Sequence, residues 1–213
     1  MIAFGMINAL AIGSVQQHTT PEKSFATGYK KIHTNHQVWL NLHGLQGDFQ
    51  ADTKHHGGTD KAVLAFGESS YRILAEQGFS HLKPGALGEN ITLGYWDETN
   101  VCIGDRFQIG ETEVEVSQPR QPCWKINAVL GETNLLRSVF QTGRTGWYLR
   151  VFREGYWQKG MQVTLLKRPH PEWTIARANE IMADKKNHGG DAKALLELPE
   201  LADAWKKDLA RGL

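Results

Sequence analysis

The sequence has only two cysteines, Cys102 and Cys123, in 213 residues, and it contains no long hydrophobic run. Two cysteines cannot form the disulfide framework that stabilises small secreted domains, so their number fits a reducing cytoplasm. No apolar stretch approaches the roughly 20 residues that a transmembrane helix needs. We therefore expect a cytoplasmic protein that has no membrane partner.

An excess of charge of one sign is also missing. The 24 basic and 23 acidic residues leave a net charge of +1 at pH 7. Proteins that bind nucleic acid through its phosphates usually carry a basic excess, so this balance argues against a nucleic-acid partner. The sequence contains no internal repeat, no low-complexity tract, and no recognisable flavin, iron–sulfur or pyridoxal-phosphate motif. Its content of 40% hydrophobic and 22% charged residues is typical of a globular domain with a core.

Short β-strands are predicted over much of the region 1–168. Residues 1–10 are apolar and lack the basic leader of a secretion signal, so we interpret them as a buried strand. Alternating or β-rich patterns predict further strands at 101–109 (turning at Gly104-Asp105), 112–117, 147–152 and 161–166. Two helices are expected at 69–77 and 133–141, ended by Gly78 and Gly143. The predicted fold class is therefore mostly β (α+β), a β-barrel-like domain with a few helices.

A change of pattern follows the strands. Pro169 and Pro171 interrupt any regular element, and we place a boundary there. The segment 172–213 predicts a three-helix unit: Thr174 caps the first helix, residues 191–196 form the second, and Pro199 begins the third. A unit of about forty residues is too small to be stable alone, so it should pack on the β domain or on a second subunit.

The densest polar string is Lys54-His55-His56-Gly57-Gly58-Thr59-Asp60-Lys61. Paired glycines let the backbone turn so that its N–H groups converge on an anion. The histidines and lysines would add donors and positive charge for a phosphate. A solvated polar turn explains the string equally well. A metal site at the adjacent histidines is disfavoured, because neighbouring side chains rarely reach one ion.

Two further strings could carry chemistry. Gly88-Glu89-Asn90 precedes an apolar strand and offers hydrogen bonds to a heterocycle, although a simple turn is the better interpretation of that string alone. Cys123 follows two prolines and Arg120, which indicates a stiff loop at a strand end where a guanidinium favours the metal-binding thiolate. Cys102 lies in an apolar strand and is interpreted as a small buried hydrophobe. From these residues alone, a functional and a structural role for Cys123 are equally supported.

In combination and in order, these strings resemble the MOSC family, named after the C-terminal domain of molybdenum-cofactor sulfurases. The matching strings are His56-Gly57-Gly58, Gly88-Glu89-Asn90, Gly104-Asp105 and the Gln-Pro-Arg-x-Pro-Cys string that ends at Cys123. Residues 45–52 also resemble the segment that precedes His-Gly-Gly in the family. The helical tail is similar to the three-helix appendage of the YiiM-like stand-alone bacterial branch, which confers resistance to N-hydroxylaminopurine. The resemblance covers nearly the whole chain.

The resemblance implies a β-barrel-like domain that binds the molybdenum cofactor in its molybdopterin form, with Cys123 as the molybdenum ligand. It also implies detoxifying reduction of small N-hydroxylated substrates, with electrons from a separate flavoprotein or iron–sulfur protein. A proton donor for the departing oxygen is expected at His56 or Glu89. The implied cofactor-binding residues are Lys54, His55, His56, Gly57, Gly58, Asp60, Lys61, Gly88, Glu89, Asn90, Arg120, Cys123 and Asn127, with Ser24 and residues 143–147 as weaker candidates.

Other functions remain open. The chain could carry sulfur or the cofactor on Cys123 without turnover, or it could bind a nucleotide without catalysis. A zinc hydrolase built on His55, His56 and Cys123 lacks suitable spacing. Turnover beyond one equivalent would separate the reductase from a carrier. For the helical tail, recruitment of the electron donor and formation of a homodimer interface are both candidate roles.

Overall fold

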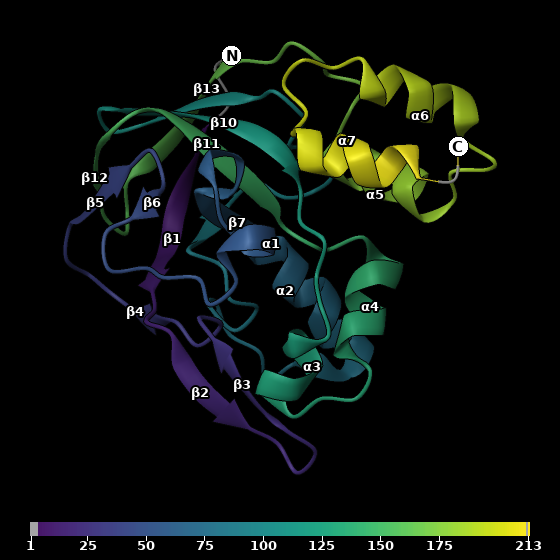
Figure 1. Ribbon diagram of the computed structural model, residues 1–213. Coiled ribbons are helices and arrows are strands. Elements are labelled where there is room, and N and C mark those ends of the chain that lie inside the picture. Colours follow the sequence, from purple (N-terminus) through teal and green to yellow (C-terminus); the bar gives the residue numbers. More distant parts are fainter. Residues whose placement is uncertain (1–3, 212) are drawn as a thin grey trace.

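The main sheet of the protein closes on itself to form a barrel (Figure 1). This computed structural model describes residues 4–211 and 213, except for the side chains of Lys54 and His55. The barrel strands are β1 (Phe4–Ile12), β7 (Val63–Gly67), β8 (Ile91–Gly94), β9 (Arg106–Ile109), β10 (Thr112–Pro119), β11 (Trp147–Arg153) and β13 (Gln162–Lys167). Their order is β13-β9-β10-β11-β7-β8-β1, and pairing of β1 with β13 completes the circle. The predicted mostly β fold class is confirmed.

Only the β7–β8 pair of the barrel is parallel; the other barrel pairs described are antiparallel. Strand β4 (Ile32–His33) extends the sheet beside β1. A small separate sheet contains β5 (Val38–Asn41), β6 (Gly44–Leu45) and β12 (Gly155–Trp157). Strands β2 (Gln16–Thr19) and β3 (Ser24–Thr27) form a hairpin that projects away from the barrel (Figure 1).

The barrel core follows from alternation along its strands. Phe107 and Ile109 of β9 and Val114 and Val116 of β10 are buried, while the residues between them on β9 are not. The hairpin expected around Gly104-Asp105 is wrong in its position: β9 begins at Arg106, and the hairpin turn lies between Ile109 and Thr112. The reason is the Asp105 carboxylate, which accepts hydrogen bonds from the Cys102 N–H and from Arg168 and so fixes 102–105 as a turn. Cys102 itself is buried, as expected.

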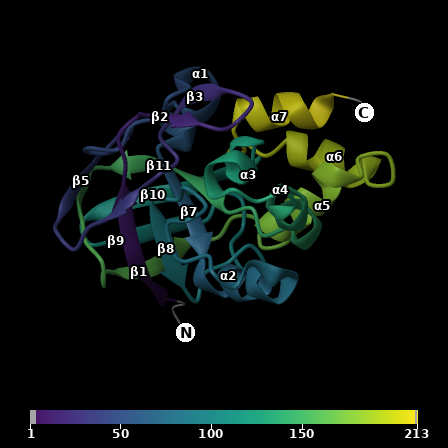
Figure 2. The same cartoon turned by 90° about the horizontal axis from the view of Figure 1, so that it is seen from below.

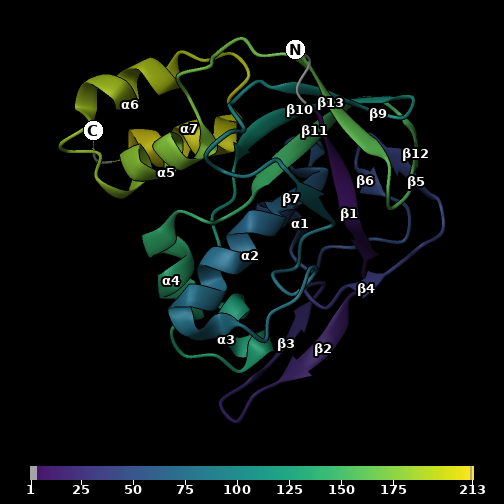
Figure 3. The ribbon, with the colours of Figure 1, turned by 180° about the vertical axis from the view of Figure 1, so that it is seen from behind.

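Helices cover one side of the barrel (Figure 3). They are α1 (Thr53–His56), α2 (Glu68–Leu74) with its π-helical extension η2 (Ala75–Phe79), α3 (Lys125–Leu130) and α4 (Leu135–Thr142), with a 3-10 turn η1 (Thr59–Lys61) after α1. Phe66, Leu74, Ile126 and Val139 belong to a second hydrophobic core between α2, α3, α4 and the barrel. The expected end at Gly143 is confirmed, because this residue follows α4 with a positive φ. Gly78 also has a positive φ and interrupts the helical geometry, but η2 ends one residue later, at Phe79.

The C-terminal helices are α5 (Ile175–Ala183), α6 (Gly189–Leu196) and α7 (Asp203–Ala210), and they pack against the barrel (Figures 1 and 3). Thr174 caps α5 as expected, since its hydroxyl accepts a hydrogen bond from the Arg177 N–H. The third helix begins at Asp203, not at Pro199 as expected. The cause is the Ala202 N–H, which donates to the Ser117 carbonyl of β10 and holds the chain extended before the helix.

The helical unit shares its hydrophobic core with the barrel. Trp173, Ile175 and Trp205 belong to one buried cluster with the strand residues Phe107 and Val116. Backbone hydrogen bonds also join the two parts, from Ile103 to Trp173 and from Ile175 to Val101. The unit is therefore packed on the barrel of its own chain. Within the part of the chain that the structure describes, no helix has the length and apolar character required to cross a membrane.

Candidate functional site

A cleft lies where the loop after β10 meets α1 and the segment after β3. Several of the predicted site residues line it together, namely His56, Lys61, Gly88, Asn90, Arg120 and Cys123. The wall also contains residues that the sequence motifs did not indicate, among them Tyr29, Lys31, Asp48, Gln50, Lys125 and Tyr148. Figure 2 shows α1 and the β2–β3 hairpin on the same side of the molecule.

Cys123 is a free, half-buried thiol on the cleft wall. Its loop starts where β10 ends at Pro119, which pairs with Trp147 of β11. The loop ends at α3, where the Cys123 carbonyl accepts a hydrogen bond from the Ile126 N–H. The segment is therefore anchored at both ends, and it presents the sulfur to the cleft without a strand or helix around it.

Arg120 places a buried guanidinium in the same wall. The residue is 7% exposed, and its Nη1 has no hydrogen-bond partner within the described residues. The guanidinium carbon lies 5.8 Å from the ring centre of Tyr29, whose buried hydroxyl also has no hydrogen-bond partner among those residues. Burial raises the pKa of Tyr29. The charge of Arg120 opposes that rise, as does the approach of its guanidinium to the Tyr29 hydroxyl, which falls short of hydrogen-bond geometry. A buried charge with an unused donor is costly, so this corner is suited to an anionic or polar ligand.

Cationic side chains dominate the electrostatics of the cleft. Burial lowers the pKa of His56, and the positive charges of Arg120, Lys61 and Lys125 add to the effect. Burial likewise lowers the pKa of Lys61. Lys125 donates to the Ala26 carbonyl at 3.0 Å, which ties α3 to the β2–β3 hairpin. The positive charges around His56 thus disfavour its protonated form, and an anion in the cleft would favour that form.

Two carboxylates of the cleft wall, Asp48 and Asp52, partly balance these charges. Asp48 accepts hydrogen bonds from the Lys31 ammonium and from the Gly13 N–H. Through these two bonds, Asp48 connects its own segment of the cleft wall to Gly13 and to Lys31. Lys31 is almost completely buried, and burial lowers its pKa despite the Asp48 charge.

The Gly88-Glu89-Asn90 string is largely used for architecture. Asn90 accepts from the Leu64 N–H and donates to the Ala11 carbonyl, so it bridges β7 and β1. Glu89 is 1% exposed, and its Oε1 accepts from Tyr71, Gly85 and Thr92. It does not line the cleft, and its buried Oε2 has no partner among the described residues.

The remaining predicted residues lie outside the cleft wall. Gly57 and Gly58 form the turn: a Cβ on Gly57 would lie 2.8 Å from the Thr53 carbonyl oxygen, and Gly58 has a φ of +97°. Asp60 pairs with Arg150 at 2.9 Å. Asn127 joins α3 to α4 by donating to Thr133 and accepting from Leu136.

The last predicted residues are the two weaker candidates, Ser24 and the segment 143–147, and the pair Lys54 and His55. Ser24 bonds across its hairpin to Thr19 and does not line the cleft. Of residues 143–147, Gly146 contacts the site indirectly, because its carbonyl accepts from the Arg120 N–H at 3.0 Å. The side chains of Lys54 and His55 lie outside the described part of the chain.

Some of the cleft residues that sequence reasoning missed come from segments without a motif. Tyr29 and Lys31 follow the β2–β3 hairpin, and Tyr148 lies on β11. Three of the other missed residues carried a signal: Lys125 stands two residues after Cys123, and Asp48 and Gln50 lie in the segment 45–52 that resembles the family. No cluster of three or more His, Cys, Asp or Glu side chains within the described residues is arranged to hold a metal ion.

The described residues form a closed barrel with a cationic cleft that contains a free thiol. The chain belongs to the MOSC domain family, whose family model matches residues 52–164. A second family model, the YiiM-like 3-alpha helix domain, matches residues 173–211. MOSC domains are associated with binding of the molybdenum cofactor, and membership gives this chain a role related to that cofactor.

Individual relatives agree with this assignment. The chain is 37% identical over 199 residues to the uncharacterized protein YflK of Bacillus subtilis, covering 93% of this chain and 90% of that protein. The crystal structure of YiiM from Geobacillus stearothermophilus has a TM-score of 0.80 and 27% identity, with 98% of both chains covered. A Gibberella moniliformis protein named a reductase is 30% identical over 182 residues, which are 84% of this chain but 32% of that longer protein.

Proposed function

We propose that this chain is a molybdenum-cofactor-dependent oxidoreductase that reduces small N-hydroxylated substrates such as N-hydroxylaminopurine, with Cys123 as the molybdenum ligand. The observation that carries the proposal is the placement of the free Cys123 thiol in one cleft with the unpartnered Arg120 Nη1 and Tyr29 hydroxyl. The name of the fungal relative supports the oxidoreductase class.

The residues present fit a pterin cofactor in the molybdopterin form. A thiolate is the ligand that a soft metal centre prefers. Arg120, Lys61 and Lys125 supply positive donors for a phosphate, and Tyr29 and Tyr148 supply flat apolar surface with hydroxyl groups for a heterocycle. Both buried groups without partners, on Arg120 and Tyr29, would gain one.

The bound cofactor supplies a two-electron redox centre, and the chain supplies binding, orientation and protons. Reduction of an N–OH group requires a proton at the departing oxygen. We assign that proton to an imidazole nitrogen of His56, because His56 lines the cleft and Glu89 does not. The Glu89 Oε1 is also occupied by three donors. Since the sequence contains no flavin or iron–sulfur motif, the electrons would come from a separate flavoprotein or iron–sulfur protein.

Metal content and turnover test the proposal together. Protein purified from cells that synthesise the cofactor should contain about one molybdenum per chain, as measured by elemental analysis, and should reduce N-hydroxylaminopurine repeatedly with an artificial electron donor. Cys123→Ala should lose molybdenum and activity while keeping its melting temperature. Cys102→Ala is the matched control, since Cys102 is the buried cysteine, and it should keep both.

Three results would contradict the proposal. Wild-type protein without molybdenum would refute the cofactor role, and a Cys123→Ala variant with full metal content would refute the ligand assignment. Consumption of one substrate equivalent at most would replace the reductase by a carrier of sulfur or cofactor.

A further inference from the structure

The backbone of Arg120 is held by Gly146. Its N–H donates to the Gly146 carbonyl at 3.0 Å, one residue past the point where β10 and β11 stop pairing. The orientation of the guanidinium in the cleft therefore depends on where the Gly146 peptide lies. Gly146 has a φ of +79°, and a Cβ there would lie 2.6 Å from the Ala65 carbonyl oxygen, so this peptide is closely confined.

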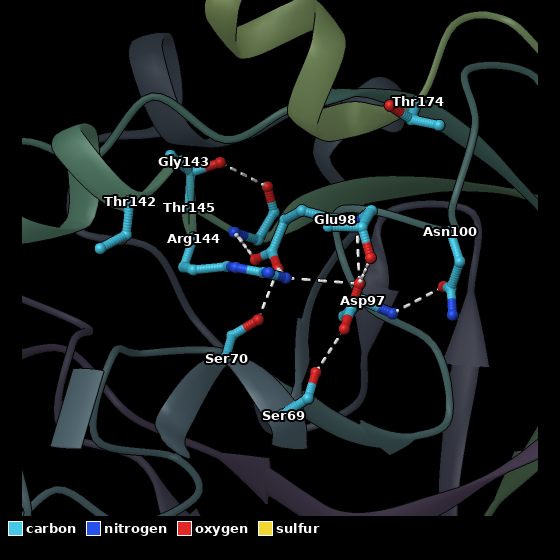
Figure 4. A network of polar contacts seen from close by, with 12 residues as sticks. Ser69, Ser70, Asp97, Glu98, Asn100, Thr142, Gly143, Arg144, Thr145 and Thr174 are labelled. Carbon is cyan, nitrogen blue, oxygen red and sulfur yellow. Dashed lines mark hydrogen bonds and ion pairs between the residues drawn. The ribbon is translucent and has the colours of Figure 1, made fainter. Parts of the chain in front are cut away.

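A buried carboxylate holds the backbone N–H of the same residue, Gly146. The Gly146 N–H donates to Glu98 Oε1 at 2.8 Å, and the Ser70 hydroxyl donates to Glu98 Oε2 at 2.5 Å. Figure 4 shows the Arg144 side chain pointing at Glu98 and Asp97, at 3.5 and 3.4 Å. Glu98 is fully buried, so its carboxylate is compensated by these donors rather than by water.

The helical unit reaches the same peptide from its own side. Asn179 on α5 donates through Nδ2 to the Thr145 hydroxyl at 2.9 Å and to the Gly143 carbonyl at 3.2 Å. The Thr145 hydroxyl in turn donates to the Gly146 carbonyl at 3.0 Å. In addition, the Ala176 N–H at the start of α5 donates to the Glu98 carbonyl at 2.7 Å. The carbonyl of Gly146 is thus connected to α5 through Thr145, and its N–H through Glu98.

We propose that Asn179 and Glu98 are positioning residues for the cleft, which fix Arg120 through the Gly143–Gly146 segment. The three-helix unit is then a support of the anion-binding site as well as a cover for the barrel. The inference rests on the proposed function only for the identity of the anion. The contacts from α5 to Arg120 stand whether or not the chain reduces an N-hydroxylated substrate.

Hydrogen exchange of the purified full-length chain, followed by mass spectrometry, tests the connection directly. Asn179→Ala should speed exchange in peptides that contain the Arg120 amide, because the carbonyl that accepts it loses its support. Two controls separate this effect from general weakening. Asn187→Ala removes an exposed amide of the same unit that donates to Asp184. Ser69→Ala removes one hydrogen bond to Asp97, next to Glu98 in the network. Neither control should change exchange at Arg120.

Calorimetric titration with inorganic phosphate gives the functional readout without cofactor or turnover. Wild-type protein should bind phosphate, Arg120→Ala should abolish that binding, and Asn179→Ala should weaken it about tenfold, as losing a partner behind a binding group does. Glu98→Gln keeps an acceptor for Gly146 and should retain more affinity than Glu98→Ala.

Two outcomes overturn the inference. One is an Asn179→Ala variant with wild-type exchange at Arg120. The other is an Asn179→Ala variant that binds phosphate normally although its melting temperature is lowered, because the contact would then be structural only. Faster exchange together with weaker phosphate binding, but no reductase activity in the wild type, would uphold the positioning role and refute the proposed function.

Discussion

His56 lies near three positively charged side chains and one carboxylate that influence its pKa. Burial and the charges of Arg120, Lys61 and Lys125 lower its pKa, while Asp52 opposes them. A histidine in this setting is mostly neutral at pH 7, and it becomes a better proton holder when an anion occupies the cleft. The residue therefore reports on the charge of its ligand.

We expect the pKa of His56 to rise when inorganic phosphate binds. The added negative charge offsets the three cations that lower the pKa in the free protein. The measurement is an NMR titration of the histidine ring protons with and without phosphate. The Arg120→Ala variant is the control, because it should not bind phosphate and its His56 titration should be the same in both samples. An unchanged His56 titration in the presence of bound phosphate would place the anion elsewhere.

The same pKa has a consequence for stability, whose sign follows from linkage. Because the folded pKa lies below the unfolded one, the unfolded chain takes up the proton more readily, and stability is lost as pH falls through the unfolded value of about 6.5. His56→Gln should therefore lose less melting temperature than the wild type between pH 7 and pH 5. Parallel losses in calorimetric scans of both proteins would contradict this.

Gly146 directly precedes strand β11, and its backbone conformation and close packing should make it sensitive to substitution. Gly146→Ala combines a left-handed backbone, at about 1–2 kcal/mol, with displacement of the Ala65 carbonyl, at roughly 1–3 kcal/mol. Gly131 is a matched control, because its φ of +69° is similar but nothing lies within 4 Å of a Cβ there. Denaturant unfolding should show the larger loss for Gly146→Ala. Equal losses would mean that the close approach is relieved at no cost.

Elements with a clear period could be predicted from sequence. Strand β10 follows from the alternation that starts at Thr112, and the end of α4 follows from Gly143. The failures occurred where tertiary contacts override the local pattern. Asp105 turns 102–105 away from the strand that the apolar spacing indicated. The hydrogen bond from Ala202 to β10 delays α7 in the same way.

The candidate site was only partly predictable for a related reason. Arg120 and Cys123 carry a local signal, two prolines and a charge within one loop. Tyr29, Lys31 and Tyr148 reach the cleft only because the barrel closes, and that closure depends on pairings between distant segments. Local patterns contain no information on those pairings.

At the scale of the whole molecule, one core connects barrel and helical unit. Trp205 of α7 is 1% exposed and belongs to the cluster that includes Val116 of β10. Trp205→Ala should reduce the free energy of unfolding by roughly 3–5 kcal/mol, as measured in denaturant, and should loosen both parts in one transition. Trp124→Ala is the matched control, since that ring is 42% exposed, and should cost much less. Two separate transitions would show that the helical unit melts independently.

The pairing of β1 with β13 has a consequence for the protein during its synthesis. Residues 4–6 find their partners at 162–164, near the other end of the barrel sequence. Until the ribosome has released that region, the first strand has an unpaired edge, and such edges favour aggregation. The barrel can therefore close only after residues 162–164 have been synthesised. Pairing over such a long sequence separation favours slow folding. Chaperones that cover the unpaired edge would then protect the nascent chain.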